Sequence, residues 1–246
     1  MKKPNINTAK NGYEEEKLVV KNLNNNEKIK ESLNFNNNRF RRVTGNNKTD
    51  IISYDKNIKI QIKKYSKRQF QHLDRHWLDD FIKSIPQLKP VRKMFKDLFE
   101  YPLLEGGKYI DKSIKIKKLC ISNYSQEELN NFLVLLNNHK KLILNYAFLG
   151  NNLEMSPEYL LGVEYINKIR DNIKVFKIKK IIDYLENMNF KISPKKTRII
   201  LGNEKYKDII SLQRKGGDTG KKTSNQLQFK ITISNLKNIE YKEYML

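Results

Sequence analysis

The segment at residues 48–63, KTDIISYDKNIKIQIK, constrains the fold more than any other part of the sequence. Two runs rich in β-branched residues flank a cluster of turn formers at 55–57, which predicts a β-hairpin. Side chains alternate between the two faces of a strand, so the second run has an apolar face and a polar face. The apolar face holds Ile58, Ile60 and Ile62, and the polar face holds Lys59, Gln61 and Lys63. Asp50 lies on the first strand, where the hairpin can bring its carboxylate next to Gln61.

An acid, an amide oxygen and a lysine at one point are what metal-assisted attack on a phosphodiester requires. Asp50 is a hard oxygen ligand suited to Mg²⁺, and the Gln61 side-chain carbonyl is a neutral one. Lys63 can hydrogen-bond the attacking water and offset the negative charge that develops on the phosphate. The alternative is a half-exposed hairpin whose charged side chains are solvated, because a motif this short also occurs by chance.

The charge of the chain favours a polyanionic partner. Its 246 residues include 49 Lys and Arg against 27 Asp and Glu, a formal charge of +22, and nucleic acid is the most common partner of such a chain. A membrane-surface protein would gather its basic residues on one amphipathic helix, whereas here they are scattered, so we expect no membrane partner.

The N-terminus lacks the apolar core of a signal peptide, and no apolar run reaches the ~18 residues of a membrane span. The single cysteine, Cys120, excludes a disulfide framework, and together these features predict a cytoplasmic protein.

Periodicity predicts an α/β protein. Helical patterns cover 8–33, 73–85, 91–99, 125–136 and 178–188, and a further helix is expected to begin at Ser156-Pro157-Glu158. Strand patterns cover 39–44, 114–121, 197–201, 209–213 and 227–233. Ser125 and Glu128 have the spacing of a capping box. His72 and His76 fall four apart on one face of the expected helix, a spacing that zinc sites use, but no third ligand stands out apart from Asp79 or Asp80, and packing and capping explain the histidines as well.

The C-terminal part of the chain has a different composition. Residues 191–230 hold eleven Lys and Arg against three Asp and Glu, gathered around a glycine-rich loop at 214–225. This loop lacks the spacing of a P-loop. Arg and Lys pair with guanine edges, and Asn and Gln pair with adenine edges, so the loop is suited to reading bases. The alternative is a solvated basic hairpin that contacts phosphates without sequence preference.

Four stretches together resemble a known family. They are TAKNGYEEEK at 8–17, TDI at 49–51 with IQIK at 60–63, FQHLDRHW at 70–77, and ISLQRKGGDTGKKTSNQLQFKI at 210–231. In this order they resemble the small monomeric type II restriction endonucleases of the HinP/MspI group, within the PD-(D/E)xK nuclease superfamily. The closer similarity is to the HinP-type enzyme, which cuts duplex DNA at GCGC.

The resemblance implies a mixed five-stranded sheet flanked by helices and a C-terminal β-rich region that recognises DNA. It divides the chain into a catalytic core at 1–123, a helical region at 124–190 and a recognition region at 191–246, packed as one unit.

The resemblance also implies roles for single residues. Asp50, Gln61 and Lys63 match the catalytic positions, and Glu16 matches an acid that approaches the metal, so Asp50, Gln61 and Glu16 are the implied metal ligands. Gln61 replaces the usual Asp or Glu, which leaves the site one negative charge short unless Glu16 supplies it. Thr49 replaces the proline of the superfamily motif.

The expected function is therefore Mg²⁺-dependent hydrolysis of duplex DNA at a short, GCGC-like site, leaving 5′-phosphate and 3′-hydroxyl ends. We expect a monomer on DNA, and a cognate DNA methyltransferase in the same system. His72 differs from the glutamine expected in its stretch. The expected DNA contacts are Gln71, His72, Arg75, Gln213, Arg214, Lys215, Thr223, Asn225 and Gln226. The alternatives are a non-catalytic basic DNA-binding protein and a PD-(D/E)xK nuclease of DNA repair or transposition.

Overall fold

The chain divides into two compact units, each assembled from separated segments. The computed structural model describes residues 6–27, 30–31, 34–35, 38–44, 48–66, 71–99, 124–166, 169–193, 198–203, 207–215 and 226–245. The first unit comprises Met1–Gln71, Phe148–Ile181 and Leu236–Leu246, and the second comprises His72–Ala147 and Ile182–Asn235. The expected division of the sequence at residues 123 and 190 stays a prediction.

The first unit is built on a mixed sheet. Its order is β1 (Phe40–Arg42), β2 (Ile51–Ser53), β3 (Lys59–Tyr65), β5 (Tyr159–Ile166), β6 (Ile169–Lys177) and β11 (Tyr241–Met245). β3 and β5 are parallel, and the other neighbours are antiparallel. The α/β class with a mixed sheet is thus confirmed. The sheet has six strands instead of five because the C-terminal segment returns to pair with β6, Tyr241 opposite Phe176.

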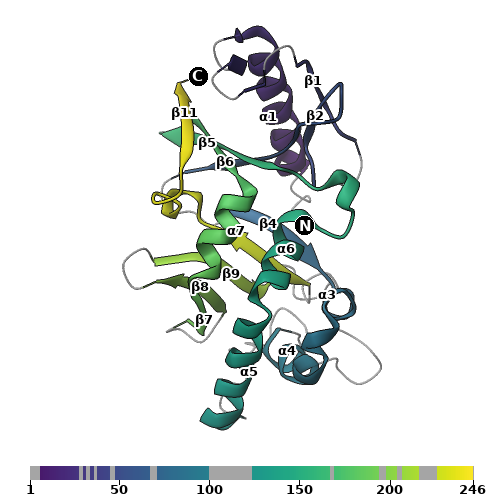
Figure 1. Cartoon of the computed structure of the whole chain (residues 1–246), viewed down its shortest axis with the longest axis vertical. Coiled ribbons are helices and arrows are strands. Elements are labelled where there is room, and N and C mark those ends of the chain that lie inside the picture. Colours follow the sequence, from purple (N-terminus) through teal and green to yellow (C-terminus); the bar gives the residue numbers. More distant parts are fainter. Residues whose placement is uncertain are drawn as a thin grey trace. The chain divides into compact units, whose positions relative to one another are not determined.

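Helix α1 (Ile6–Asn25) packs against this sheet (Figure 1). Its Val19 and Leu23 are buried in one cluster with Ile60 and Ile62 of β3, so the predicted apolar face of the hairpin is the one that contacts the core. Asn24 fixes the helix to β1 by two hydrogen bonds: its Nδ2 donates to Phe40 O at 3.0 Å, and Phe40 N donates to its Oδ1 at 2.8 Å.

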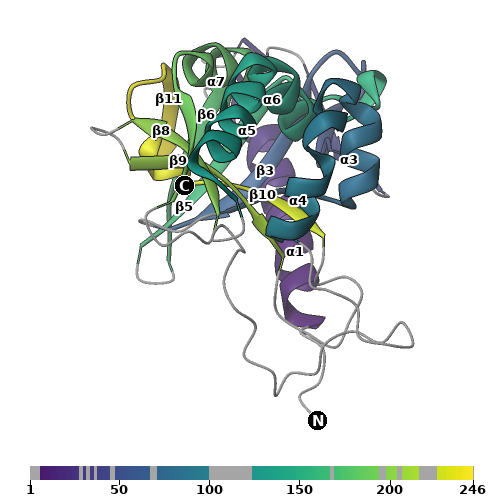
Figure 2. The same cartoon turned by 90° about the horizontal axis from the view of Figure 1, so that it is seen from below.

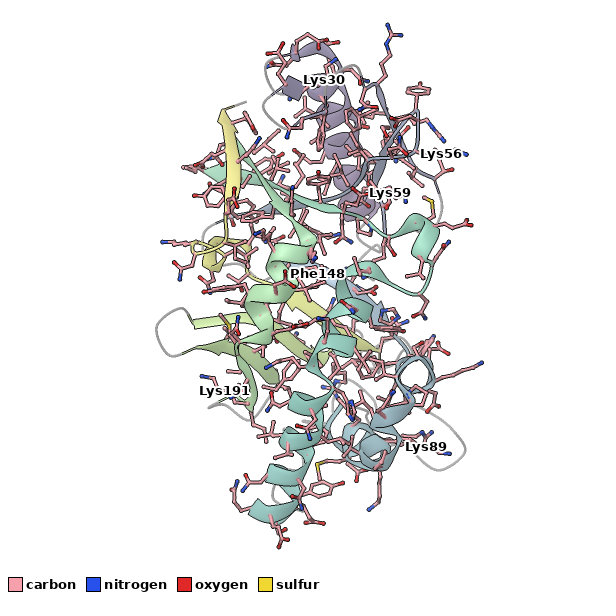
Figure 3. The ribbon with its side chains drawn as sticks, in the orientation of Figure 1. Lys30, Lys56, Lys59, Lys89, Phe148 and Lys191 are labelled. Carbon is pink, nitrogen blue, oxygen red and sulfur yellow. The ribbon has the colours of Figure 1, made fainter. Side chains whose placement is uncertain are left out.

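The predicted hairpin is present, with Ile51 of β2 opposite Ile60 of β3. The turn forms because the Asp55 carboxylate accepts a hydrogen bond from Asn57 N at 3.1 Å, an arrangement that favours chain reversal. Lys56 adopts a left-handed φ of 61°, and its exposed side chain extends away from the ribbon (Figure 3).

The second unit is built on an antiparallel sheet. Its order is β4 (Gln71–His76), β10 (Leu227–Ile231), β9 (Lys207–Arg214), β8 (Ile199–Asn203) and β7 (Asn189–Ile192). β8, β9 and β10 coincide with the three strands predicted near the C-terminus. The remaining helices are α3 (Leu78–Ser84), α4 (Arg92–Phe99), α5 (Gln126–Asn138), α6 (Lys140–Leu149) and α7 (Ile178–Glu186), with short 3₁₀ turns at Pro86–Val91, Leu153–Met155 and Ile233–Asn235.

An aromatic core joins this sheet to its helices. The Phe81 ring of α3 meets Phe229 of β10 at a centroid distance of 5.6 Å and Phe95 of α4 at 5.8 Å, both edge to face. Phe95 in turn meets Phe132 of α5 at 5.0 Å, and α3, α4 and α5 are grouped accordingly in Figure 2. Edge-to-face pairs of this kind add about 0.5–1.5 kcal/mol each beyond their buried area.

Two helix predictions are wrong. The segment at 73–77 belongs to strand β4 and α3 begins only at Leu78, because the segment is incorporated at the edge of the sheet beside β10. The segment after Ser156 is strand β5, whose buried Leu160 and Leu161 lie between β3 and β6. In both places pairing with distant strands outweighs local helical spacing. The strand expected at 114–121 lies outside the described residues.

Within the described part of the chain, no helix is both long enough and apolar enough to cross a membrane.

The capping box of α5 offers a test of helix stabilisation. Glu128 N donates to Ser125 Oγ at 3.1 Å and Ser125 N donates to Glu128 Oε2 at 2.7 Å, so both predicted bonds form. Replacing Ser125 by Ala should lower the free energy of unfolding by about 1 kcal/mol, because the Glu128 N–H loses its acceptor. Urea unfolding measures the change, with Gln126→Ala as a control in the first turn.

Candidate active site

The hairpin places Asp50 directly across from the segment that holds Gln61 and Lys63. Asp50 N donates to Ile60 O at 2.9 Å, and Ile62 N donates to Asp50 Oδ2 at 2.6 Å. The backbone of β3 therefore holds the Asp50 carboxylate at Ile62, which lies between Gln61 and Lys63.

Gln61 is a buried amide with an unsatisfied oxygen. The residue is 2% exposed, and its Oε1 has no hydrogen-bond partner among the described residues. It is buried because β3 is an interior strand, between β2 and β5. The alternative of a solvated polar face does not hold at this position. Leaving a buried oxygen without a partner costs about 1–3 kcal/mol, and such an atom calls for a ligand or another functional explanation.

Glu16 on α1 joins this group. The charge of Glu16 interacts with the charges of Asp50 and Lys63. The structure therefore brings together the two carboxylates and the lysine that the sequence suggested. Lys63 is half-buried on β3 and attracts both carboxylates.

Arg42 at the end of β1 is a member of the site that the sequence analysis missed. Its Nε donates to Glu16 Oε2 at 2.7 Å, and its Nη2 lies 2.6 Å from the same oxygen. It also lowers the pKa of Asp50 through its charge. The available signal was the strand expected at 39–44, whose pairing with the hairpin brings Arg42 opposite Ile51.

Burial perturbs both carboxylates. It raises the pKa of Asp50 above the usual value, against the charge of Lys63 and the Ile62 hydrogen bond, which lower it. Burial also raises the pKa of Glu16, opposed first by the hydrogen bond from Arg42, while the Asp50 charge raises it further. Both acids are thus less readily ionised than in water, and a cation bound between them would reverse the effect.

The donor set fits a hard divalent cation. Asp50 and Glu16 contribute carboxylate oxygens and Gln61 contributes its unsatisfied amide oxygen, and Mg²⁺ prefers oxygen ligands with water completing its shell. Among the described residues, no three His, Cys, Asp or Glu side chains are placed to hold a metal ion. At the hairpin, the Gln61 amide oxygen would be a third protein ligand beside the two carboxylates, with water completing the shell.

Thr49, the residue before Asp50, stabilises this corner of the fold. It is 2% exposed, and its Oγ1 donates to Met155 O at 2.7 Å. This bond ties the residue before Asp50 to the turn that precedes β5.

The residues expected to contact DNA lie partly where β9 ends and β10 begins. Lys215 N donates to Gln226 O at 2.8 Å, and Arg214 pairs with Leu227 across the strands, so Arg214, Lys215 and Gln226 are neighbours. Gln213 pairs with Gln228 at the next position of the two strands. The Ser211 Oγ donates a hydrogen bond to Gln213 Oε1 at 3.2 Å. Thr223 and Asn225 lie outside the described residues.

The other expected contacts lie on β4. Gln71 is half-buried, whereas His72 and Arg75 are exposed. The Arg75 charge acts on Lys230 of β10, whose pKa is lowered first by burial, then by Arg198 and by Arg75.

His76 has a structural role in the second unit. One ring nitrogen contacts the Asp74 carboxylate, and the other, Nδ1, lies 2.9 Å from the Tyr146 hydroxyl. These two contacts, with a strand in place of the expected helix, explain His76 without zinc.

Comparison with known proteins identifies the family of the chain. The profile of the R.HinP1I restriction endonuclease family matches residues 38–237. The crystal structure of restriction endonuclease MspI in complex with its cognate DNA is similar with a TM-score of 0.45 and 11% identity, covering 82% of this chain and 75% of that chain. No curated protein matches the sequence. The family match puts the chain among the type II restriction endonucleases, which are site-specific deoxyribonucleases. More narrowly, the chain belongs to the R.HinP1I restriction endonuclease family.

The raised pKa of Asp50 predicts a stability effect. A carboxyl group whose pKa is higher in the folded state destabilises the fold when ionised, and this cost disappears as the pH falls below the pKa of the unfolded state. Asp50→Asn should therefore raise the Tm of the metal-free protein at pH 7.5, by about 1–4 °C, with the gain vanishing near pH 4. Thermal unfolding from pH 4 to pH 8 measures it.

Asp55→Asn is the matched control on the same hairpin. Hydrogen bonds from Ser53 and then Asn57 lower the pKa of Asp55, so its neutral replacement should not raise the Tm at pH 7.5. A Tm gain in Asp50→Asn that stays constant across the pH range would contradict the assigned electrostatics.

Proposed function

We propose that the protein hydrolyses phosphodiester bonds of duplex DNA at a short, GCGC-like site in a Mg²⁺-dependent reaction. The observation that supports this most is the buried Gln61 Oε1, without a partner among the described residues and one position from the Ile62 N–H that holds Asp50. A polar atom left in this state beside two carboxylates fits a metal ligand better than a scaffold residue.

Asp50, Gln61 and Glu16 are the proposed ligands. Bound Mg²⁺ would act as a Lewis acid on the phosphate and lower the pKa of its water. The second oxygen of each carboxylate is suited to this task, because Asp50 gives Oδ2 to Ile62 and Glu16 gives Oε2 to Arg42.

Lys63 is the proposed partner of water and phosphate. Its ammonium can hydrogen-bond the attacking water and a non-bridging phosphate oxygen, and offset the added charge of the transition state. In the overall reaction the water oxygen bonds to phosphorus, the bond from phosphorus to O3′ breaks, and O3′ takes a proton. The products are a 5′-phosphate and a 3′-hydroxyl.

Recognition is assigned to the second unit. Gln213, Arg214, Lys215 and Gln226 at the β9–β10 hairpin, with Thr223 and Asn225, supply amide and basic groups suited to base edges. Gln71, His72 and Arg75 are proposed contacts from β4. Many of the remaining Lys are proposed to contact phosphates, consistent with the charge of +22. We propose a cytoplasmic monomer acting beside a cognate methyltransferase.

Lys63→Ala tests the catalytic assignment. The variant should lose at least about 100-fold in cleavage rate, because the transition-state charge loses its stabilising partner, while DNA affinity changes little. Plasmid digestion with Mg²⁺ and gel-shift titration measure the two effects. Discrete fragments are expected from wild type, and sequencing their ends gives the site and the ends produced.

Lys64→Ala is the control, because the adjacent Lys64 is exposed and lies over the Tyr165 ring at 3.5 Å, away from the site. It should cleave like wild type. Intact plasmid with wild type, together with a shifted band at low salt, would instead indicate a non-catalytic DNA-binding protein.

Two substitutions separate base recognition from phosphate contact. Lys215→Ala should weaken binding to all duplexes alike and reduce the slope of log K against log salt by about 0.9.

Gln213→Ala should weaken binding mainly to the cleaved sequence, by about 1–3 kcal/mol, because an amide that pairs with a base edge discriminates between bases. Fluorescence anisotropy in Ca²⁺, at several salt concentrations, distinguishes these results. If Gln213→Ala lost the same binding free energy on a duplex with the cleaved sequence and on a duplex without it, Gln213 would not be a residue that recognises bases.

A further inference from the structure

Arg42 is the member of the site that neither ligates metal nor contacts substrate in the proposed function. Both of its contacts with Glu16 fall on one oxygen, Oε2, at 2.7 Å from Nε and 2.6 Å from Nη2. This geometry fixes the carboxylate while leaving Oε1 to another partner. The side chains are largely enclosed, with 22% of Arg42 and 21% of Glu16 exposed, so the pair is shielded from solvent and salt more than a surface pair would be.

The guanidinium is held from a second side. Its Cζ lies 3.7 Å from the centroid of the Tyr13 ring, one turn before Glu16 on α1. An Arg stacked on an aromatic face and paired with a carboxylate has little freedom to leave. Its backbone is also fixed, because Val43 N donates to Asp50 O at 2.9 Å and Arg42 pairs with Ile51.

Arg42 also balances the charge of the site. The two carboxylates, Glu16 and Asp50, each experience the positive charges of Arg42 and Lys63. With both acids ionised, these four groups have no net charge, and Lys48, which also acts on Asp50, makes the site net positive before any metal or DNA arrives. A divalent cation entering this site gains little attraction until a scissile phosphate adds negative charge.

We propose that Arg42, by adding a fixed positive charge to the DNA-free site, makes tight metal binding depend on DNA. This inference rests on the proposed metal-dependent function. It gives a role to one of the three cations, Arg42, Lys48 and Lys63, that act on the two acids. The role requires a permanent positive charge, which Arg retains at all pH values of interest.

Mn²⁺ binding to the DNA-free protein tests the proposal, read as the loss of the free-ion signal in electron paramagnetic resonance. Arg42→Met should bind Mn²⁺ about tenfold more tightly than wild type, because a positive charge beside the ligands is removed. Arg42→Lys keeps the charge and should stay within about twofold of wild type by the same argument. Arg41→Met is the matched control, since Arg41 is exposed on the same strand and should leave the affinity unchanged.

Thermal unfolding verifies that each variant is folded before it is compared. Suppose that wild type binds Mn²⁺ and cleaves DNA. If Arg42→Met then binds Mn²⁺ no more tightly than wild type, the proposed role of Arg42 is wrong, while the proposed nuclease function stands. Tighter binding in both Arg42→Met and Arg42→Lys overturns the charge argument. A wild-type protein that neither binds Mn²⁺ nor cleaves DNA overturns the proposed function itself.

Discussion

The hydrogen bond from the Ile62 backbone N–H to Asp50 Oδ2, at 2.6 Å, is the interaction on which the candidate site depends. It gives the carboxylate a partner on the strand that supplies both Gln61 and Lys63, so one backbone amide sets the spacing of three side chains. It also stabilises the ionised form of an acid whose burial acts in the opposite direction. The geometry of the site is therefore a property of strand β3, while α1 and β1 add Glu16 and Arg42 to an arrangement that β3 already holds.

Local patterns in the sequence predicted what local physics decides. The alternation of Ile60, Gln61 and Ile62 gave the faces of β3, and the Ser125 capping box gave the start of α5. Turn formers at 55–57 gave the hairpin and, through it, the approach of Asp50 to Gln61. The assignment of Glu16 came from the resemblance alone, and the structure places that residue within electrostatic reach of Asp50.

Such local patterns could not predict which strands pair when they lie far apart in the sequence. Residues 73–77 have helical spacing but are held in β4 at the edge of a sheet, and the segment after Ser156 becomes β5 between two distant strands. The depth of Gln61 depends on that same β5, so its buried, unsatisfied oxygen could not be foreseen from alternation alone. Arg42 was missed because its partner, Glu16, lies on a different element, and no sequence spacing connects them.

The sheet of the first unit draws its strands from three separated parts of the chain, with β5 parallel to β3 and β11 at the far edge. The hairpin that holds Asp50 and Gln61 is local in the sequence, whereas β5, which pairs with β3 beside Gln61, lies far along the chain. Closing such long loops is slow and entropically costly. A chain that has formed only the hairpin therefore has Asp50, Gln61 and Lys63 without the strand that lies beside them, and the sheet of the first unit is complete only when distant segments pair.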